Sequence, residues 1–265
     1  MVEGDFIEFN IKKSYADGII KFSAVEDQYP IDLGSLVIDN TNHQKGSDWA
    51  IIRCLPNSET GLLPHQAQNQ FIRVTRETPT VNYGIIRITG CGIDYTPEGP
   101  GPSNGGHLLN SDNATLQTSI GVYLGVDVNS PNVWHKYVVD SQPANSGGPI
   151  IWEGNNNFAI GIHTGGDCET DGYNRGTSFE YDPLENALQN FYGGNTIYVD
   201  TQSMTSLENG NVFSPYDTIE EGINAATSGG KLFITTGTYN GNSDLLINKA
   251  IIILPPACGK ITINP

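Results

Sequence analysis

The chain has 265 residues, which suits one mid-sized domain joined to a second unit rather than a single small domain. Only 16% of these residues are charged, and the 31 glycines and 15 prolines favour strands and turns over long helices. The formal net charge of −16 disfavours nucleic acid and anionic lipid as partners, and no apolar run reaches the roughly 18 residues that span a bilayer.

The first part of the chain has the pattern of short strands separated by turns. Runs of β-branched and aromatic residues predict strands at 6–11, 50–53, 85–90, 120–128 and 133–139. A loop rich in proline and glycine is expected from Thr96 to Gly106. Several short strands at this spacing indicate a sandwich or a barrel.

A helix is predicted to end this part. Asp182, Pro183 and Glu185 form a capping-box start, and an apolar stripe runs from Leu184 to Phe191. The pair Gly193-Gly194 then stops the helix and begins a linker, which we place at 193–196.

The remaining residues, 197–265, change in character. A strand at 197–200 is followed by a second helix, for which Asp217 and Glu220 predict a capping box. Closely spaced strands are then expected at 231–235, 245–248, 250–254 and 260–263. Short strands separated by Gly, Asn and Pro turns are typical of a parallel β-helix coil.

This second segment resembles a known family. The residues that carry the resemblance are Ile197 to Asp200, Ile219 to Ala226, and Gly229 to Ile234 leading to Gly237-Thr238-Tyr239. They are similar to the N-terminal cap and first coil of the pectate-lyase-like right-handed β-helix superfamily. Because a solenoid needs several repeats to bury its faces, the resemblance implies that the native protein continues beyond Pro265.

One serine has the surroundings of a nucleophile. Ser146 lies in Asn145-Ser146-Gly147-Gly148-Pro149, where glycines allow a tight turn and the close approach of a substrate. By itself this pattern also fits an ordinary turn between two strands.

Three further motifs favour the catalytic interpretation, because they occur with the serine in the order found in chymotrypsin-like serine proteases. They are Ser47 to Ile52, Arg87 to Gly92 and Ala159 to Gly166. The chain resembles this family over residues 6–192, and more closely its bacterial branch that includes the glutamyl endopeptidases. The resemblance implies an all-β chymotrypsin-like double β-barrel with a C-terminal helix, spanning 1–192.

The resemblance also implies residue roles. Ser146 would be the nucleophile, Asp48 would orient the catalytic histidine, and the backbone N–H groups of Ala144 and Ser146 would form the oxyanion hole. Ala144 stands where the family usually has glycine, so the hole is in doubt in the free protein. Asn145 carries no charge, so activation through an ion pair with a new N-terminus is not expected.

The catalytic histidine is missing from its expected place. The template has it roughly 45 residues before the aspartate, which falls near Met1, and no histidine precedes His43. His43 is too close to Asp48 to reach a facing strand, and His65, His107 and His135 match no protease motif. We therefore expect an N-terminally truncated chain whose first barrel is incomplete and whose peptidase activity is small.

Two candidate specificity residues predict opposite P1 preferences. His163 matches the histidine with which glutamyl endopeptidases hold an acidic P1 side chain, whereas Asp140 matches the acid that selects basic P1 residues in trypsins. Asp140 turned to solvent is an equal alternative. Ser141, Thr164 and Gly165 complete the implied substrate site, and an acidic P1 residue is the preferred interpretation.

The sequence thus predicts a secreted or cell-surface serine endopeptidase that acts on a protein or peptide, without metal or cofactor. Alternatives are a non-catalytic adhesin that reuses the protease fold and a polysaccharide-active β-helix protein; an extracellular glycan is a further partner that the β-helix would allow. Four cysteines, at positions 54, 91, 168 and 258, match no metal-binding spacing and leave disulfides or free thiols open.

Overall fold

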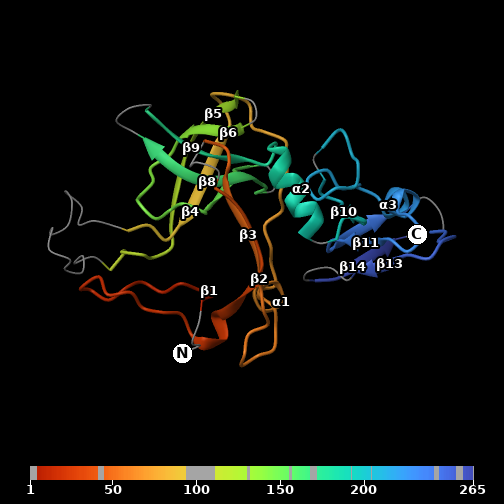
Figure 1. Ribbon diagram of the computed structural model, residues 1–265, viewed down its shortest axis with the longest axis horizontal. Coiled ribbons are helices and arrows are strands. Elements are labelled where there is room, and N and C mark those ends of the chain that lie inside the picture. The colour runs from red at the N-terminus through yellow and green to blue at the C-terminus, as the bar shows by residue number, and fades with distance from the viewer. Residues whose placement is uncertain are drawn as a thin grey trace. The chain divides into compact units, whose positions relative to one another are not determined.

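The computed structural model describes residues 5–40, 45–93, 111–129, 132–154, 157–167, 172–191, 193–203, 205–241, 245–254 and 259–264 (Figure 1). It is mostly β, with 40% strand and 11% helix. The chain divides into two compact units, residues 1–64 with 79–178 and residues 65–78 with 179–265. None of the described helices is long and apolar enough to cross a membrane.

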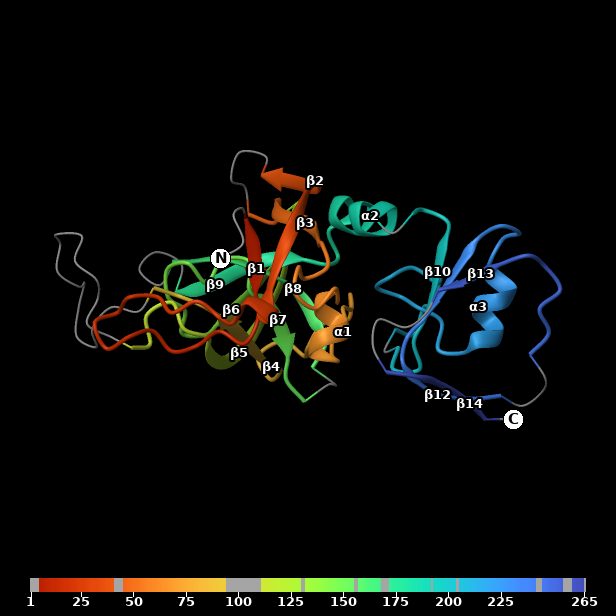
Figure 2. The ribbon, with the colours of Figure 1, turned by 90° about the horizontal axis from the view of Figure 1, so that it is seen from below.

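The centre of the first unit is a closed, fully antiparallel barrel of six strands (Figure 2). In chain order they are β4 (Ile85–Gly90), β5 (Gln117–Asn129), β6 (Asn132–Val138), β7 (Pro149–Trp152), β8 (Ala159–Asp167) and β9 (Tyr173–Ser178). Around the barrel the order is β4-β5-β6-β9-β8-β7. Closure pairs the strands without leaving an exposed edge.

Alternating residues of these strands fill the barrel, as the period of two in a strand requires. The core consists of Ile86, Ile88, Tyr123, Tyr137, Val139, Ile150 and Ile160, with Trp152 packed against it. One closed barrel is therefore confirmed, the double barrel stays a prediction, and β4 has the predicted bounds. Strand β9 was not predicted, because its sequence Tyr-Asn-Arg-Gly-Thr-Ser has no apolar run.

A separate antiparallel sheet precedes the barrel in the first unit. It contains β1 (Phe6–Glu8), β2 (Gln28–Asn40) and β3 (Asp48–Cys54), in that spatial order, and the 3-10 turn η1 (Val25–Asp27) leads into β2. In the described part of the chain these three strands form an open sheet. Tryptophans lie in both parts of this unit: Trp49 in β3, Trp134 in β6 and Trp152 in β7.

The second unit is built on parallel pairing. Its elements are α2 (Asp182–Phe191), β10 (Thr196–Val199), α3 (Ile219–Ala225), β11 (Lys231–Ile234), β12 (Gly237–Asn240), β13 (Ile252–Leu254) and β14 (Ile261–Asn264), and the short α1 (Pro64–Gln68) enters it. One parallel sheet has the order β10-β11-β13, and β12 pairs in parallel with β14. The expectation of short parallel strands after residue 196 is confirmed.

Apolar side chains and one buried ion pair hold this unit together. The core consists of Val199, Ile219, Ile223, Leu232, Ile234 and Tyr239. The guanidinium Nε of Arg73 lies 2.6 Å from Oδ2 of Asp200, whose side chain is only 6% exposed. The segment 65–78 is thereby fixed to the end of β10.

Two predictions for this unit are wrong in detail. The cap of α3 is Thr218, not Asp217: the Thr218 hydroxyl accepts the N–H of Glu221 and donates to its carboxylate, so the capping box lies one residue later. Residues 245–248 form no strand, because they carry the chain from the β12 sheet to the β13 sheet, and Leu246 is exposed there.

Cys54 and Cys91 form no disulfide, and burial raises the pKa of both thiols. Cys168 and Cys258 lie outside the described residues, as do His43, His107 and the whole of the predicted 96–106 loop. These parts of the sequence analysis remain predictions.

Candidate active site

The chain reaches Ser146 through a turn with an unusual residue at its third position. The N–H of Asn145 donates to the carbonyl of Gln142 at 3.2 Å, and Ala144 has φ of 71°. Proline at the second position, here Pro143, and positive φ at the third fit a type II turn, which normally has glycine third. Ala144 therefore adopts the glycine-like conformation of that turn position, at a cost of about 1–2 kcal/mol.

Ser146 occupies the second position of the next turn. The N–H of Gly148 donates to the carbonyl of Asn145 at 3.1 Å, and Gly147 has φ of 91°. A Cβ on Gly147 would meet nothing within 4 Å, so the backbone angle, not space, favours glycine there. The two consecutive turns leave Ser146 exposed at the surface of the barrel.

Strand β8 holds the serine turn in place. The N–H of Gly147 donates to the carbonyl of His163 at 2.8 Å, and the N–H of His163 donates to the carbonyl of Gly148 at 2.8 Å. Thr164 lies at a register shift between β8 and β9, so its carbonyl is turned out of the ladder. The Ser146 hydroxyl donates to this carbonyl at 3.3 Å.

Two backbone donors beside the hydroxyl are unengaged. Within the described part of the chain, the N–H groups of Ala144 and Ser146 have no protein acceptor. Their neighbours Asn145, Gly147 and Gly148 all donate within the turns or to β8. An oxyanion hole requires donors that are held in place but unoccupied, and this pair satisfies that requirement.

Asp48 is attached to the same pair of strands. It begins β3, is half-buried, and its carbonyl accepts the Thr177 hydroxyl at 2.9 Å. Thr177 on β9 pairs with Ile162 on β8, two residues before the Thr164 contact of Ser146. Two residues of a strand span roughly 7 Å. Asp48 and Ser146, which are 98 apart in sequence (146 − 48), thus each contact one residue of the β8–β9 pair, Thr177 and Thr164 respectively.

Neither buried histidine of the barrel is free to serve as a base for Ser146. His135 is fully buried, with Nδ1 3.0 Å from the Tyr123 hydroxyl and Nε2 2.9 Å from the Ile160 carbonyl. His163 is 2% exposed, and its Nδ1 lies 2.6 Å from the Tyr137 hydroxyl.

Both imidazoles are held neutral. Burial lowers the pKa of His135 to about 4, and burial together with the positive charge of Arg175 lowers the pKa of His163 to about 4. His65 belongs to the second unit.

The remaining predicted substrate residues gather at the end of β8. Gly165 and Gly166 follow Thr164, and the Ser141 hydroxyl lies 3.5 Å from where a Cβ on Gly166 would stand. Asp140 is exposed, at the end of the β6 segment. Sequence reasoning missed Tyr137, Asn174 and Arg175, which approach this region from β6 and β9 and match no catalytic motif.

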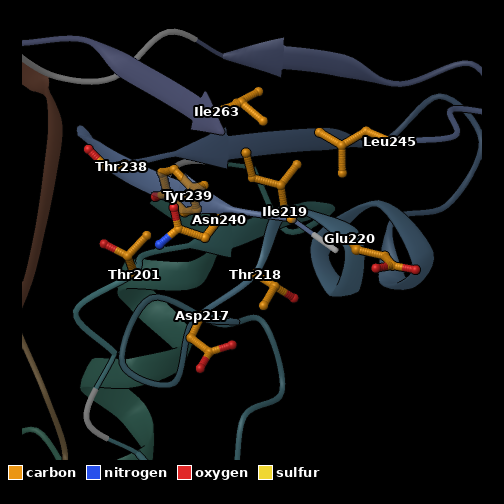
Figure 3. Close-up of a pocket in the computed structure, with 11 residues that line it drawn as sticks. Thr201, Asp217, Thr218, Ile219, Glu220, Thr238, Tyr239, Asn240, Leu245 and Ile263 are labelled. Carbon is orange, nitrogen blue, oxygen red and sulfur yellow. The ribbon is translucent and has the colours of Figure 1, made fainter. Parts of the chain in front are cut away.

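The second unit has an open pocket of about 410 Å³ (Figure 3). Hydroxyl, amide and carboxylate groups surround an apolar floor, the lining being Thr201, Asp217, Thr218, Ile219, Glu220, Thr238, Tyr239, Asn240, Gly241, Leu245 and Ile263. Side chains of Glu208, Asp217 and Glu221 come within 4.8 Å of one another beside it. Burial and the neighbouring carboxylates raise the pKa of Glu208 and Asp217.

Comparison with protein-family models and with curated proteins finds no match to this chain.

Proposed function

We propose that the first unit is the scaffold of a secreted serine endopeptidase in which Ser146 is the nucleophile and Asp48 the orienting acid. The observation that carries the proposal is the exposed Ser146 hydroxyl on a double turn, beside two unengaged N–H groups. A closed antiparallel barrel and a second sheet that supplies Asp48 support the chymotrypsin-like double-barrel interpretation, with its first barrel incomplete.

The proposed chemistry is acyl transfer. The Ser146 oxygen bonds to the scissile carbonyl carbon while its proton passes to an imidazole base. The oxyanion that forms accepts hydrogen bonds from the N–H groups of Ala144 and Ser146. Breakage of the C–N bond returns the proton to the leaving amine, and water then hydrolyses the acyl-enzyme. The described histidines make no hydrogen bond to the Ser146 hydroxyl, so the described residues supply no such base, and without one the proposed enzyme would have little activity.

A serine-directed fluorophosphonate, with and without added imidazole, tests the proposal. We expect slow labelling that accelerates with imidazole and is lost in Ser146→Ala. Ser206→Ala, which removes an exposed serine of the second unit, is the matched control and should label as the wild type does. Absence of labelling at every imidazole concentration would contradict a catalytic Ser146.

Two observations favour a second candidate, a non-catalytic surface protein that reuses the same scaffold. The Ser146 hydroxyl donates to a backbone carbonyl, which cannot act as a base, and Ala144 holds a strained position that favours glycine. The labelling experiment separates the two candidates.

For the second unit we propose the cap and first coils of a right-handed β-helix. Parallel pairing of β10, β11 and β13, with α3 covering the apolar core, supports this interpretation. The mixed polar and apolar lining of its pocket suits an extracellular glycan better than an anion, because the described residues that line it include two carboxylates and no basic side chain.

A further inference from the structure

The N–H of Ala144, one of the two donors of the proposed oxyanion hole, belongs to a peptide group that is held from behind. The carbonyl of this group is that of Pro143, and it accepts the N–H of Ile93 at 2.8 Å. Because the C=O and the N–H of a trans peptide group point in opposite directions, this bond turns the unengaged Ala144 N–H away from Ile93. The orientation of that donor therefore depends on the position of residue 93.

The same arrangement recurs in the next two peptide groups. The carbonyl of Gly92 shares its peptide group with the N–H of Ile93 and accepts the N–H of Ala114 at 2.9 Å. The carbonyl of Asn113 shares its peptide group with the Ala114 N–H and accepts the hydroxyl of Ser14 at 2.6 Å. A row of three peptide groups thus runs from the Ser14 hydroxyl to the oxyanion hole, formed by residues 113–114, 92–93 and 143–144.

Glycines allow this row to lie against the serine turn. A Cβ on Gly92 would stand 2.7 Å from Oδ1 of Asn145 and 2.8 Å from Cβ of Gln142. A Cβ on Gly90 would stand 2.7 Å from the same Oδ1 atom. Such separations are too short for a real Cβ, so the close approach that the last hydrogen bond of the row requires depends on glycine at both positions.

The far end of the row is fixed by a buried side chain of the loop between β1 and η1 (Figures 1 and 2). Ser14 is 6% exposed, and its N–H donates to Oγ1 of Thr115 at 3.3 Å. The Asn113 side chain donates from Nδ2 to the carbonyl of Gly18, in the same loop, at 3.0 Å. Away from water a hydrogen bond is electrostatically stronger, and bonds in a row polarise one another. The Ser14 hydroxyl is therefore placed to influence every peptide group that follows it.

Resting on the proposed endopeptidase function, we propose that Ser14 is a positioning residue of the oxyanion hole, which orients and polarises the Ala144 N–H through the row of three peptide groups. A peptide group whose C=O accepts a hydrogen bond is a stronger donor at its N–H, so the last N–H of the row gains from each bond before it. The Ser146 N–H lies outside the row, because the carbonyl of its own peptide group, that of Asn145, accepts the N–H of Gly148 at 3.1 Å. The two donors of one hole thus provide an internal comparison.

NMR of the full chain labelled at Ser146 with a fluorophosphonate, in the presence of imidazole, tests the role of Ser14. The phosphoryl oxygen of the adduct takes the place of the oxyanion, so the amide protons of Ala144 and Ser146 should both move downfield in the wild type. In Ser14→Ala the downfield movement of the Ala144 proton should shrink by about a tenth to a third, and that of Ser146 should not change. Loss of stability alone would not separate these two signals.

Labelling rates give a second measure with matched variants. Ser14→Ala should be labelled about two- to fivefold more slowly than the wild type, as expected for one hydrogen bond, and Ser14→Thr, which keeps the hydroxyl, should restore the rate. Ser35→Ala is the control, because it removes a hydroxyl of the same unit that donates to a backbone carbonyl, that of Asp32, at 2.7 Å. It should be labelled as the wild type is.

A further variant removes the last bond of the row. Ile93→Pro has no N–H at position 93, and its labelling should be slower by about tenfold or more, since loss of one oxyanion donor costs about 10²–10³ in rate. Thermal unfolding shows whether each variant folds. Ser14→Ala decides the question if Ile93→Pro does not fold.

Amide exchange in the unlabelled protein does not depend on catalysis. The Ala114 and Ile93 amides should exchange about fivefold faster in Ser14→Ala, and at the wild-type rate in Ser35→Ala. Unchanged exchange at both amides, or equal changes of the Ala144 and Ser146 signals in the adduct, would overturn the role of Ser14 and leave the endopeptidase intact. Absence of Ser146 labelling in every form refutes the endopeptidase, and the role of Ser14 with it.

Discussion

The two units bury different kinds of side chain. The barrel encloses titratable and amide groups, His135, His163 and Asn174, among its aliphatic and aromatic residues. The core of the second unit is an aliphatic cluster with one tyrosine, and Asp200, which pairs with Arg73, is the one buried carboxylate among its described residues. Buried polar groups must be satisfied one by one, whereas an apolar core needs volume and pattern. The stability of the barrel should therefore depend on pH and on added methyl groups, and the stability of the second unit should depend on its ion pair.

The largest effect is expected in the second unit. Arg73→Met leaves the Asp200 carboxylate buried without its cation and should lower the free energy of unfolding of that unit by about 3–5 kcal/mol. Faster amide hydrogen exchange in β10 and β11 measures this loss. Lys136→Met removes a pair that is roughly a third exposed, Lys136–Asp127 in the barrel, and should cost less than about 1 kcal/mol. Equal costs would show that burial does not decide the difference.

The barrel should lose stability in mild acid. The pKa of His135 and of His163 is about 4 in the fold and about 6.5 when unfolded. Between these values the unfolded chain binds protons that the folded barrel excludes, so stability falls as pH drops from about 6.5 to 4, by about 3 kcal/mol per histidine. Urea unfolding at a series of pH values measures the slope.

A histidine variant assigns that slope. His135→Gln keeps a side chain that can accept from Tyr123 or donate to the Ile160 carbonyl, and it should remove about half of the pH dependence. An unchanged slope in this variant would place the titrating groups elsewhere.

Neighbouring glycines of β8 should respond oppositely to a methyl group. Gly166→Ala forces a Cβ into Asn174 and should cost about 2–3 kcal/mol, as overpacking of a fixed neighbour does. Gly165→Ala brings ordinary contact with the flexible Arg175 and should cost well under 1 kcal/mol. Thermal unfolding of both variants checks the difference, and similar costs would contradict the placement of Asn174.

The smallest effect concerns the serine turn. Ala144→Gly relieves positive φ and should raise stability by about 0.5–1 kcal/mol, less than the full strain because glycine also loosens the unfolded chain. Ala114→Gly, at φ of 51° away from the serine, should stabilise similarly. If the oxyanion hole is limited by Ala144, only the first variant will accelerate fluorophosphonate labelling.

The sequence alone predicts those strands and helices whose apolar residues recur with the period of the element. The run Ile85–Gly90 is a strand at the predicted position, and Leu184 is the buried residue of the predicted α2. Strand β9 was not predicted because its buried positions are Asn174, Gly176, Thr177 and Ser178, which are polar or lack a side chain. The cap at Thr218 was missed because Asp217 offers an equally good local pattern, and only tertiary packing chooses between them.

Some residues of the candidate site are predicted by local sequence motifs and others are not. Ser146 and Asp48 are visible because their neighbours in sequence form motifs. The Tyr137 hydroxyl contacts His163, which lies 26 residues away in sequence (163 − 137). Arg175 pairs with Gly165, which lies 10 residues away (175 − 165). Such pairs depend on the register of the barrel, which no single segment specifies.

All three tryptophans of the chain belong to the first unit, at positions 49, 134 and 152. Indole emission therefore reports only that half of the molecule, and Trp49 and Trp134 are each less than a tenth exposed. The second unit has no tryptophan. Selective excitation of indole will therefore follow unfolding of the barrel and of the sheet that precedes it, and will not report unfolding of the parallel strands.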